Sequence, residues 1–150
     1  MACPVDTIFV LDESGSIRPS NFSLMKSFLS RLVSRLDIDS GNTRVGIVTF
    51  SSDIGTDINL NAHSSVASLR SAISALNYTG GGTNTAAALA YVRTTMLTSA
   101  AGDRSDIPNV VVVLTDGASN NSTVTQVIRA IAFCPIYIVY DLTDKNSALY

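Results

Sequence analysis

The sequence predicts a single α/β domain, residues 1–150, built on a doubly wound, mostly parallel β-sheet with one antiparallel edge strand. Three observations predict it. Two continuously apolar runs, residues 7–11 and 110–114, have the length and composition of strands that are buried on both faces. Amphipathic helical segments alternate with such runs along the chain. With 46% hydrophobic and 15% charged residues, a chain of 150 residues is globular and long enough to bury a core.

The first half of the chain provides two parallel strands, a helix and the antiparallel strand. After the strand at residues 7–11, a helix spans residues 19–36, because Pro and Ser suit its first turn and apolar residues recur at helical spacing. The second strand spans residues 44–50. The turn at residues 51–53 is too short for a parallel crossover, so the third strand, residues 55–60, is expected to be antiparallel and at a sheet edge.

The second half of the chain repeats the alternation of helix and strand. The apolar pattern predicts helices at residues 64–76, 84–97 and 122–133, and strands at residues 110–114 and 135–140. The last residues, 141–150, are expected to contain a loop and the start of one more helix. No repeat or low-complexity tract interrupts this order, which supports one domain.

Charge and hydropathy give no reason to expect two classes of partner. A net charge of −2 and a pI near 5.1 give no electrostatic reason to expect nucleic acid. No apolar run approaches the roughly 20 residues that a membrane-spanning helix needs, so no membrane insertion is expected.

The two cysteines are the first indication of an extracellular location. Cys3 and Cys134 each lie one or two residues before a predicted strand, and the starts of parallel strands share one sheet edge. The thiols could therefore form a disulfide, worth about 4–5 kcal/mol on the loop-entropy model. The alternative is two separate buried thiols. Four N-glycosylation sequons are compatible with secretion, at Asn21, Asn77, Asn120 and Asn121.

Polar segments follow the two apolar strands at the point where each strand ends. Residues 12–16 follow the first strand, and residues 115–117 follow the fourth. A third polar segment, residues 80–85, contains three consecutive glycines. Open α/β sheets bind ligands at the carboxyl ends of their strands. Carboxylates combined with hydroxyls at that edge indicate a hard divalent cation bound by oxygen.

The spacing within these segments strengthens the prediction of a metal site. Asp12, Ser14 and Ser16 alternate along a turn, so their side chains can converge on one side. Asp116 adds a carboxylate at the end of a second, adjacent strand. Thr83 comes directly after the glycines, which allow the backbone to approach a site closely.

In these residues the chain resembles the von Willebrand factor A-type domain, a Rossmann-like fold with a metal-ion-dependent adhesion site. That site has the pattern D-x-S-x-S, then a Thr, then an Asp after the fourth strand. Asp12, Ser14, Ser16, Thr83 and Asp116 match all of these positions in order. The resemblance covers essentially the whole chain.

The resemblance implies how the metal is bound and what it does. Ser14, Ser16 and Thr83 would be direct ligands of Mg²⁺, with Mn²⁺ or Ca²⁺ as possible substitutes, and Asp12 and Asp116 would act through ordered water. Neutral hydroxyl ligands leave the cation electron-poor, so a partner's Glu or Asp can complete its octahedron. The implied function is adhesion and not catalysis: an extracellular module that binds collagen or another matrix protein through an acidic residue.

Alternative interpretations of the same residues use other chemistry. The metal could only order the loops of a structural matrix module that binds partners elsewhere. Asp12 could be a phosphatase nucleophile, although that chemistry needs a second acid at position 14, which is Ser. A serine hydrolase is disfavoured because His63, the only histidine, lies in a loop before a helix and is expected to be solvated. The five residues could also be simple turn and cap residues. Glu13 is interpreted as a rim residue that tunes partner choice.

The chain departs from the family pattern at its carboxyl end. The family continues after the fifth strand with a helix, a sixth strand and a last helix, and we expect the last strand and helix to be lacking here. The fifth strand, residues 135–140, would then lie at the sheet edge. Proteins normally cover such an apolar, β-branched edge, so two interpretations stay open: the chain is a fragment or isoform that lacks its end, or another chain covers the strand, for example a second copy by self-association.

Overall fold

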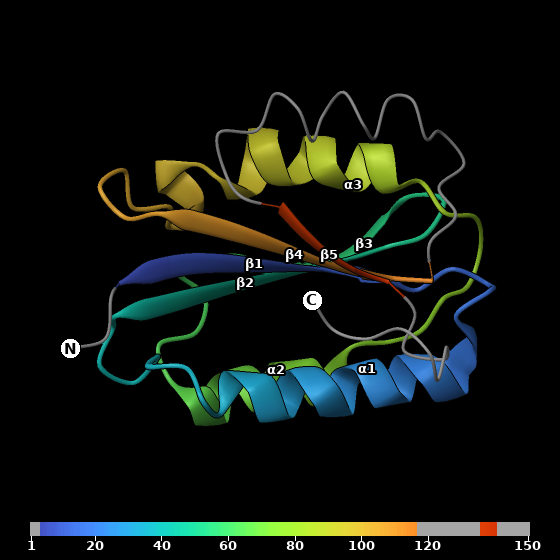
Figure 1. The fold of residues 1–150 in the computed structure, drawn as a ribbon, viewed down its shortest axis with the longest axis horizontal. Coiled ribbons are helices and arrows are strands. Elements are labelled where there is room, and N and C mark those ends of the chain that lie inside the picture. Colours follow the sequence, from blue (N-terminus) through green and yellow to red (C-terminus); the bar gives the residue numbers. More distant parts are fainter. Residues whose placement is uncertain (1–3, 117–135, 141–150) are drawn as a thin grey trace.

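Residues 4–116 and 136–140 are described by the computed structural model, in which a five-stranded sheet is covered by helices on both faces (Figure 1). The strand order is β3-β2-β1-β4-β5. The strands are β1 (Val5–Asp12), β2 (Thr43–Phe50), β3 (Ile54–Ile58), β4 (Asn109–Thr115) and β5 (Ile136–Tyr140). All neighbouring pairs are parallel except β2 and β3. The predicted fold class and the antiparallel edge strand are both confirmed.

In the described part of the chain, α-helices cover both faces of the sheet (Figure 1). Helices α1 (Arg18–Val33) and α2 (Val66–Ala75) lie side by side on the first face, and α3 (Thr85–Tyr91) lies on the second. Successive residues of β1 alternate between the two cores: Phe9 packs with α1 and α2, whereas Val10 packs with α3. A strand buried on both faces must be apolar throughout, which accounts for the continuous hydrophobic runs.

The predicted helix at residues 84–97 is only partly α-helical. It is α-helical as α3 and then widens into a π-helical turn, η1 (Val92–Met96), closed by the bond from the Leu97 amide to the Val92 carbonyl at 2.9 Å. Val92 and Met96 are both buried in the core under α3. A short 3₁₀ turn, η2 (Ser99–Ala101), then leads toward β4.

A buried ion pair joins the loop before β4 to the starts of β1 and β2. Asp6 in β1 is fully buried, and its Oδ1 accepts hydrogen bonds from Arg104 Nε at 2.9 Å and Nη2 at 2.6 Å. The Arg104 guanidinium also donates to the carbonyls of Val5, Gly41 and Asn42. The Arg104 side chain therefore joins the loop before β4 to the start of β1 and to the residues that precede β2, at the end of the sheet opposite the polar loops.

Several predictions fall outside the described residues. These concern Cys3 and Cys134, the helix at residues 122–133, the sequons at Asn120 and Asn121, and residues 141–150. Strand β5 forms one edge of the described sheet, beyond β4, and self-association through it stays a prediction. Among the described residues, none of the helices has the length and apolar character that a membrane span requires.

Candidate metal centre

Asp12 holds the first polar loop, residues 12–16, to the end of the sheet. It is the last residue of β1 and is fully buried. Its Oδ1 accepts a hydrogen bond from the Ser14 amide at 2.8 Å, and its Oδ2 accepts one from Thr115 Oγ1 at 2.6 Å. Because β1 and β4 are parallel neighbours in register, their carboxyl ends meet at one edge, and Asp12 connects the loops that follow them.

The hydroxyls of Ser14 and Ser16 lie together above Asp12. Their Oγ atoms are 3.1 Å apart, with Ser14 buried and Ser16 exposed to solvent. Mg²⁺ binds oxygen at about 2.0–2.1 Å in an octahedron, so two adjacent ligands lie roughly 2.9 Å apart. The observed separation therefore fits two neighbouring ligands of such a cation.

The glycine-rich loop packs its backbone directly against the first loop. The Gly15 amide donates to the Gly81 carbonyl at 2.9 Å, and the Gly80 amide donates to the Glu13 carbonyl at 3.1 Å. Gly80 and Gly81 have φ values of 75° and 108°, which side chains rarely tolerate. Tyr78 adds a third link, because its hydroxyl donates to the Ser14 carbonyl at 3.1 Å. The close approach expected from the glycines is confirmed.

Thr83 is held from the other side by the turn between β2 and β3. It is buried, and its neighbours on both sides are fixed: the Gly82 amide donates to Ser52 Oγ and the Asn84 amide donates to the Ser51 carbonyl, both at 2.8 Å. Asn84 then caps α3 by accepting a hydrogen bond from the Ala87 amide. Ser51 and Ser52 thus position the loop, a role that sequence reasoning missed.

Asp116 follows β4 directly and is half-buried beside the polar loops. Hydrogen bonds join Asp12 to Ser14 and Ser14 to Ser16. Within the described part of the chain, none joins Thr83 or Asp116 to this group. The fold therefore brings all five residues to one edge, with the first three in direct contact.

The interpretation of Glu13 as a rim residue is wrong. Its side chain is only 1% exposed and lies under the β2–β3 hairpin, where Oε1 accepts a hydrogen bond from Thr49 Oγ1 at 3.2 Å. The Glu13 amide donates to the Phe50 carbonyl and so extends the pairing of β1 with β2 by one residue, which turns the side chain inward. Burial raises the pKa of Glu13, and hydrogen bonds with Thr79 and Thr49 oppose that rise.

The donor set at this edge consists mainly of hydroxyls. Among residues 4–116 and 136–140, no group of three or more His, Cys, Asp or Glu side chains is placed to hold a metal. The Ser, Thr and Asp oxygens fit a hard cation such as Mg²⁺ better than a soft one.

His63 is not part of this arrangement. It is half-buried, against the expectation that it is solvated, and lines a small pocket with Thr43 and Arg44. Those two residues begin β2, at the edge of the sheet opposite the carboxyl ends of the parallel strands. Ser14 and His63 are therefore separated by the length of the sheet, which excludes a Ser–His pair.

Comparisons with known proteins agree with the fold and the location. The sequence profile described as von Willebrand factor type A domain matches residues 6–139. Matrilin-1 of Mus musculus is 40% identical over 122 residues, which are 79% of this chain and 24% of that protein. The collagen alpha-4(VI) chain of Mus musculus is 38% identical over 122 residues, 80% of this chain and 5% of that one. The chain thus spans a quarter or less of the length of these relatives.

A solved structure shares the fold over most of the chain. Proximal thread matrix protein 1 from the mussel byssus superimposes with a TM-score of 0.78 and 26% identity, covering 92% of this chain and 37% of that one. A further structure of that protein has zinc in its metal-ion-dependent adhesion site. The curated relatives are secreted extracellular matrix proteins, which confirms the predicted extracellular location.

Proposed function

Because this chain belongs to the von Willebrand factor type A domain family, we propose that it is a divalent-cation-dependent adhesion module that binds an acidic side chain of a matrix protein through Mg²⁺. In extracellular matrix proteins, domains of this family are adhesion and protein-binding modules. The relatives of matrix type are not enzymes, and we propose the same for this chain.

One observation carries the proposal: two hydroxyls at ligand spacing are held over a buried carboxylate. Ser14 and Ser16 present oxygens 3.1 Å apart. Asp12 already accepts hydrogen bonds on both of its oxygens, so it supports the loop and supplies negative charge one shell away from the cation. Thr83 would add a third hydroxyl, and Asp116 a second outer carboxylate.

The bound cation would supply a Lewis-acidic centre for a partner's carboxylate. The residues of this chain would position the cation. Asp12 fixes Ser14, and the backbone hydrogen bonds between the two loops hold the segment that carries Thr83. Mg²⁺ is the proposed cation, with Mn²⁺ or Ca²⁺ as alternatives. The zinc in the mussel protein supports occupancy of such a site by a divalent metal.

The partner is proposed to be collagen or another matrix protein. Support comes from the relatives, which include a collagen chain and a matrilin. The experiment is a binding assay on immobilised collagens and other matrix proteins, in Mg²⁺ and in EDTA. We expect binding in Mg²⁺ that chelation abolishes. Ser14→Ala should lose it, while Ser71→Ala, an exposed serine of α2, should retain it.

Circular dichroism must show that each variant is folded. Binding that survives EDTA and Ser14→Ala would instead support a structural module whose partners bind elsewhere. Hydrogen bonds between the loops do not favour that second function, because protein atoms alone already hold this edge together without a metal that orders the loops.

A further inference from the structure

Helices α1 and α2 carry basic residues and no acidic ones, although Asp39, in the loop after α1, accepts a hydrogen bond from the Val66 amide at the start of α2. Residues 18–36 and 58–102 contain no Asp or Glu. The first segment carries Arg18, Lys26, Arg31 and Arg35, and the second carries Arg70 in α2. The whole chain has a net charge of −2, so its acidic residues are concentrated elsewhere. This face is basic on an acidic protein.

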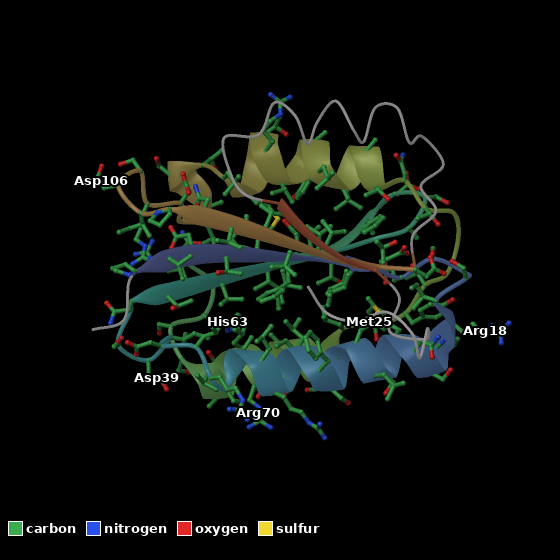
Figure 2. The ribbon with its side chains drawn as sticks, viewed as in Figure 1. Arg18, Met25, Asp39, His63, Arg70 and Asp106 are labelled. Carbon is green, nitrogen blue, oxygen red and sulfur yellow. The ribbon has the colours of Figure 1, made fainter. Side chains whose placement is uncertain are left out.

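A groove of about 400 Å³ runs between the two helices on this face. Its walls include the cationic side chains Lys26, Arg31 and Arg70 and the hydroxyls of Ser23, Ser27 and Ser30. Figure 2 shows Arg70 on the outer side of the helical layer, away from the sheet. The groove is therefore open to a ligand from solvent and is lined by hydrogen-bond donors.

The cationic groups are held in place by neutral partners. Lys26 Nζ, on α1, donates to the carbonyls of Ser74 and Leu76 at 3.0 and 2.8 Å. Arg70 Nε, on α2, donates to Ser30 Oγ at 2.9 Å. Within residues 4–116 and 136–140, no carboxylate forms an ion pair with Lys26, Arg31 or Arg70. Hydrogen bonds therefore position Lys26 and Arg70, and within the described residues no carboxylate neutralises the charge of either.

Such a groove suits sulfate groups carried on a linear chain. Guanidinium, ammonium and hydroxyl donors match sulfate oxygens, and Arg binds such oxyanions bidentately. The basic residues of α1 extend over 13 positions from Arg18 to Arg31, or about 20 Å along the helix, which is long for a single small anion. The relatives are secreted matrix proteins, so the polyanion available to this face is extracellular.

We propose that the groove between α1 and α2 binds a linear sulfated polysaccharide through Lys26, Arg31 and Arg70. This site is separate from the candidate metal centre, because it lies on the helical face and uses no residue of the polar loops. The interaction is electrostatic, so it weakens as salt rises and does not require a divalent cation.

The test measures the affinity of the folded chain for a heparin octasaccharide by calorimetry, in EDTA, over a series of NaCl concentrations. Hydrogen bonds to charged groups are strong enough that Arg31→Gln and Arg70→Gln should each weaken binding about tenfold. Arg93→Gln is the matched control, because Arg93 is exposed in η1 on the other side of the sheet. It should leave the affinity within about twofold.

Several outcomes would overturn the proposal. They are no binding by the wild type at 50 mM NaCl, equal affinity for desulfated heparin, or equal loss in Arg93→Gln. Loss of binding in EDTA would assign it to the metal centre. Equal affinity for anionic lipid vesicles or polyglutamate, with the same dependence on Arg31, would show that the face recognises charge and not sulfated sugar. Arg31 is exposed, so its replacement tests the groove without disturbing the core.

Discussion

Gly55 is the residue that makes room for the buried carboxylate beside the candidate metal centre. A Cβ atom at this position in β3 would collide with Glu13 Oε1 and Thr49 Oγ1. Because Glu13 is 1% exposed and pinned by Thr49, neither neighbour has free space to retreat into. The D-x-S-x-S pattern accepts any residue at its second position, so the pattern does not indicate that Glu13 is buried.

We therefore expect Gly55→Ala to lower the free energy of unfolding by about 1–3 kcal/mol, the usual range for overpacking. Glu13→Ala should remove part of the collision, so the double variant should be less destabilised than the sum of the two single ones. Urea unfolding of the three variants measures this. Simple additivity would contradict the contact between the two sites.

The ionised carboxyl of Asp37 should stabilise the fold in a way that depends on pH. Hydrogen bonds with Ser40 and with Asn42, whose Nδ2 donates to Oδ2 at 2.7 Å, hold the pKa of this carboxyl below its usual range. A lowered pKa means that the ionised form stabilises the fold. That contribution is complete above the carboxyl's ordinary pKa and is lost as pH falls through the lower folded value.

Asp37→Asn should accordingly be less stable than the wild type at pH 7, and the difference should shrink as the pH is lowered through the acid range. Unfolding curves at a series of pH values measure it. Asp53→Asn, a change in an exposed loop, is the control and should show little difference at any pH. A destabilisation by Asp37→Asn that does not change with pH would contradict the assignment.

At the scale of elements, the sequence predicts strands and their directions better than helix type. The turn of residues 51–53 leaves no room for a crossover, and β3 is indeed antiparallel. The stretch 84–97 was predicted as one helix but contains a π-helical turn. Both helix types bring Val92 and Met96 to the sheet, so hydrophobic spacing could not distinguish them.

The Asp6–Arg104 pair acts between elements, because it fixes the loop before β4 to the starts of β1 and β2. Arg104→Gln leaves a fully buried carboxylate without its counter-charge, and we expect a loss of about 3–5 kcal/mol. Thermal and urea unfolding measure it, with Arg93→Gln as an exposed control. A loss under 1 kcal/mol would show that the pair is not needed to hold the loop.

At the scale of the molecule, the fold separates two chemistries. Hydroxyls and carboxylates gather at the carboxyl ends of β1 and β4, while cations gather on the outer face of α1 and α2. The first was predictable because strand ends can be read from apolar runs. The group of cations on α1 and α2 was not predictable from the net charge of −2, because that value sums all charges of the chain. Only the packing of the two helices shows which charges share one face.

The proposed adhesion depends on the binding of a divalent cation at the edge that carries Ser14 and Ser16. The most direct test of that binding is calorimetric titration of the folded protein with Mg²⁺ and Mn²⁺. We predict saturable binding at one site in the wild type, unchanged in Ser20→Ala and weakened at least about tenfold in Ser16→Ala, which removes an exposed hydroxyl and leaves the core intact. A folded wild type that binds neither ion, or a Ser16→Ala variant that binds as tightly, would contradict it.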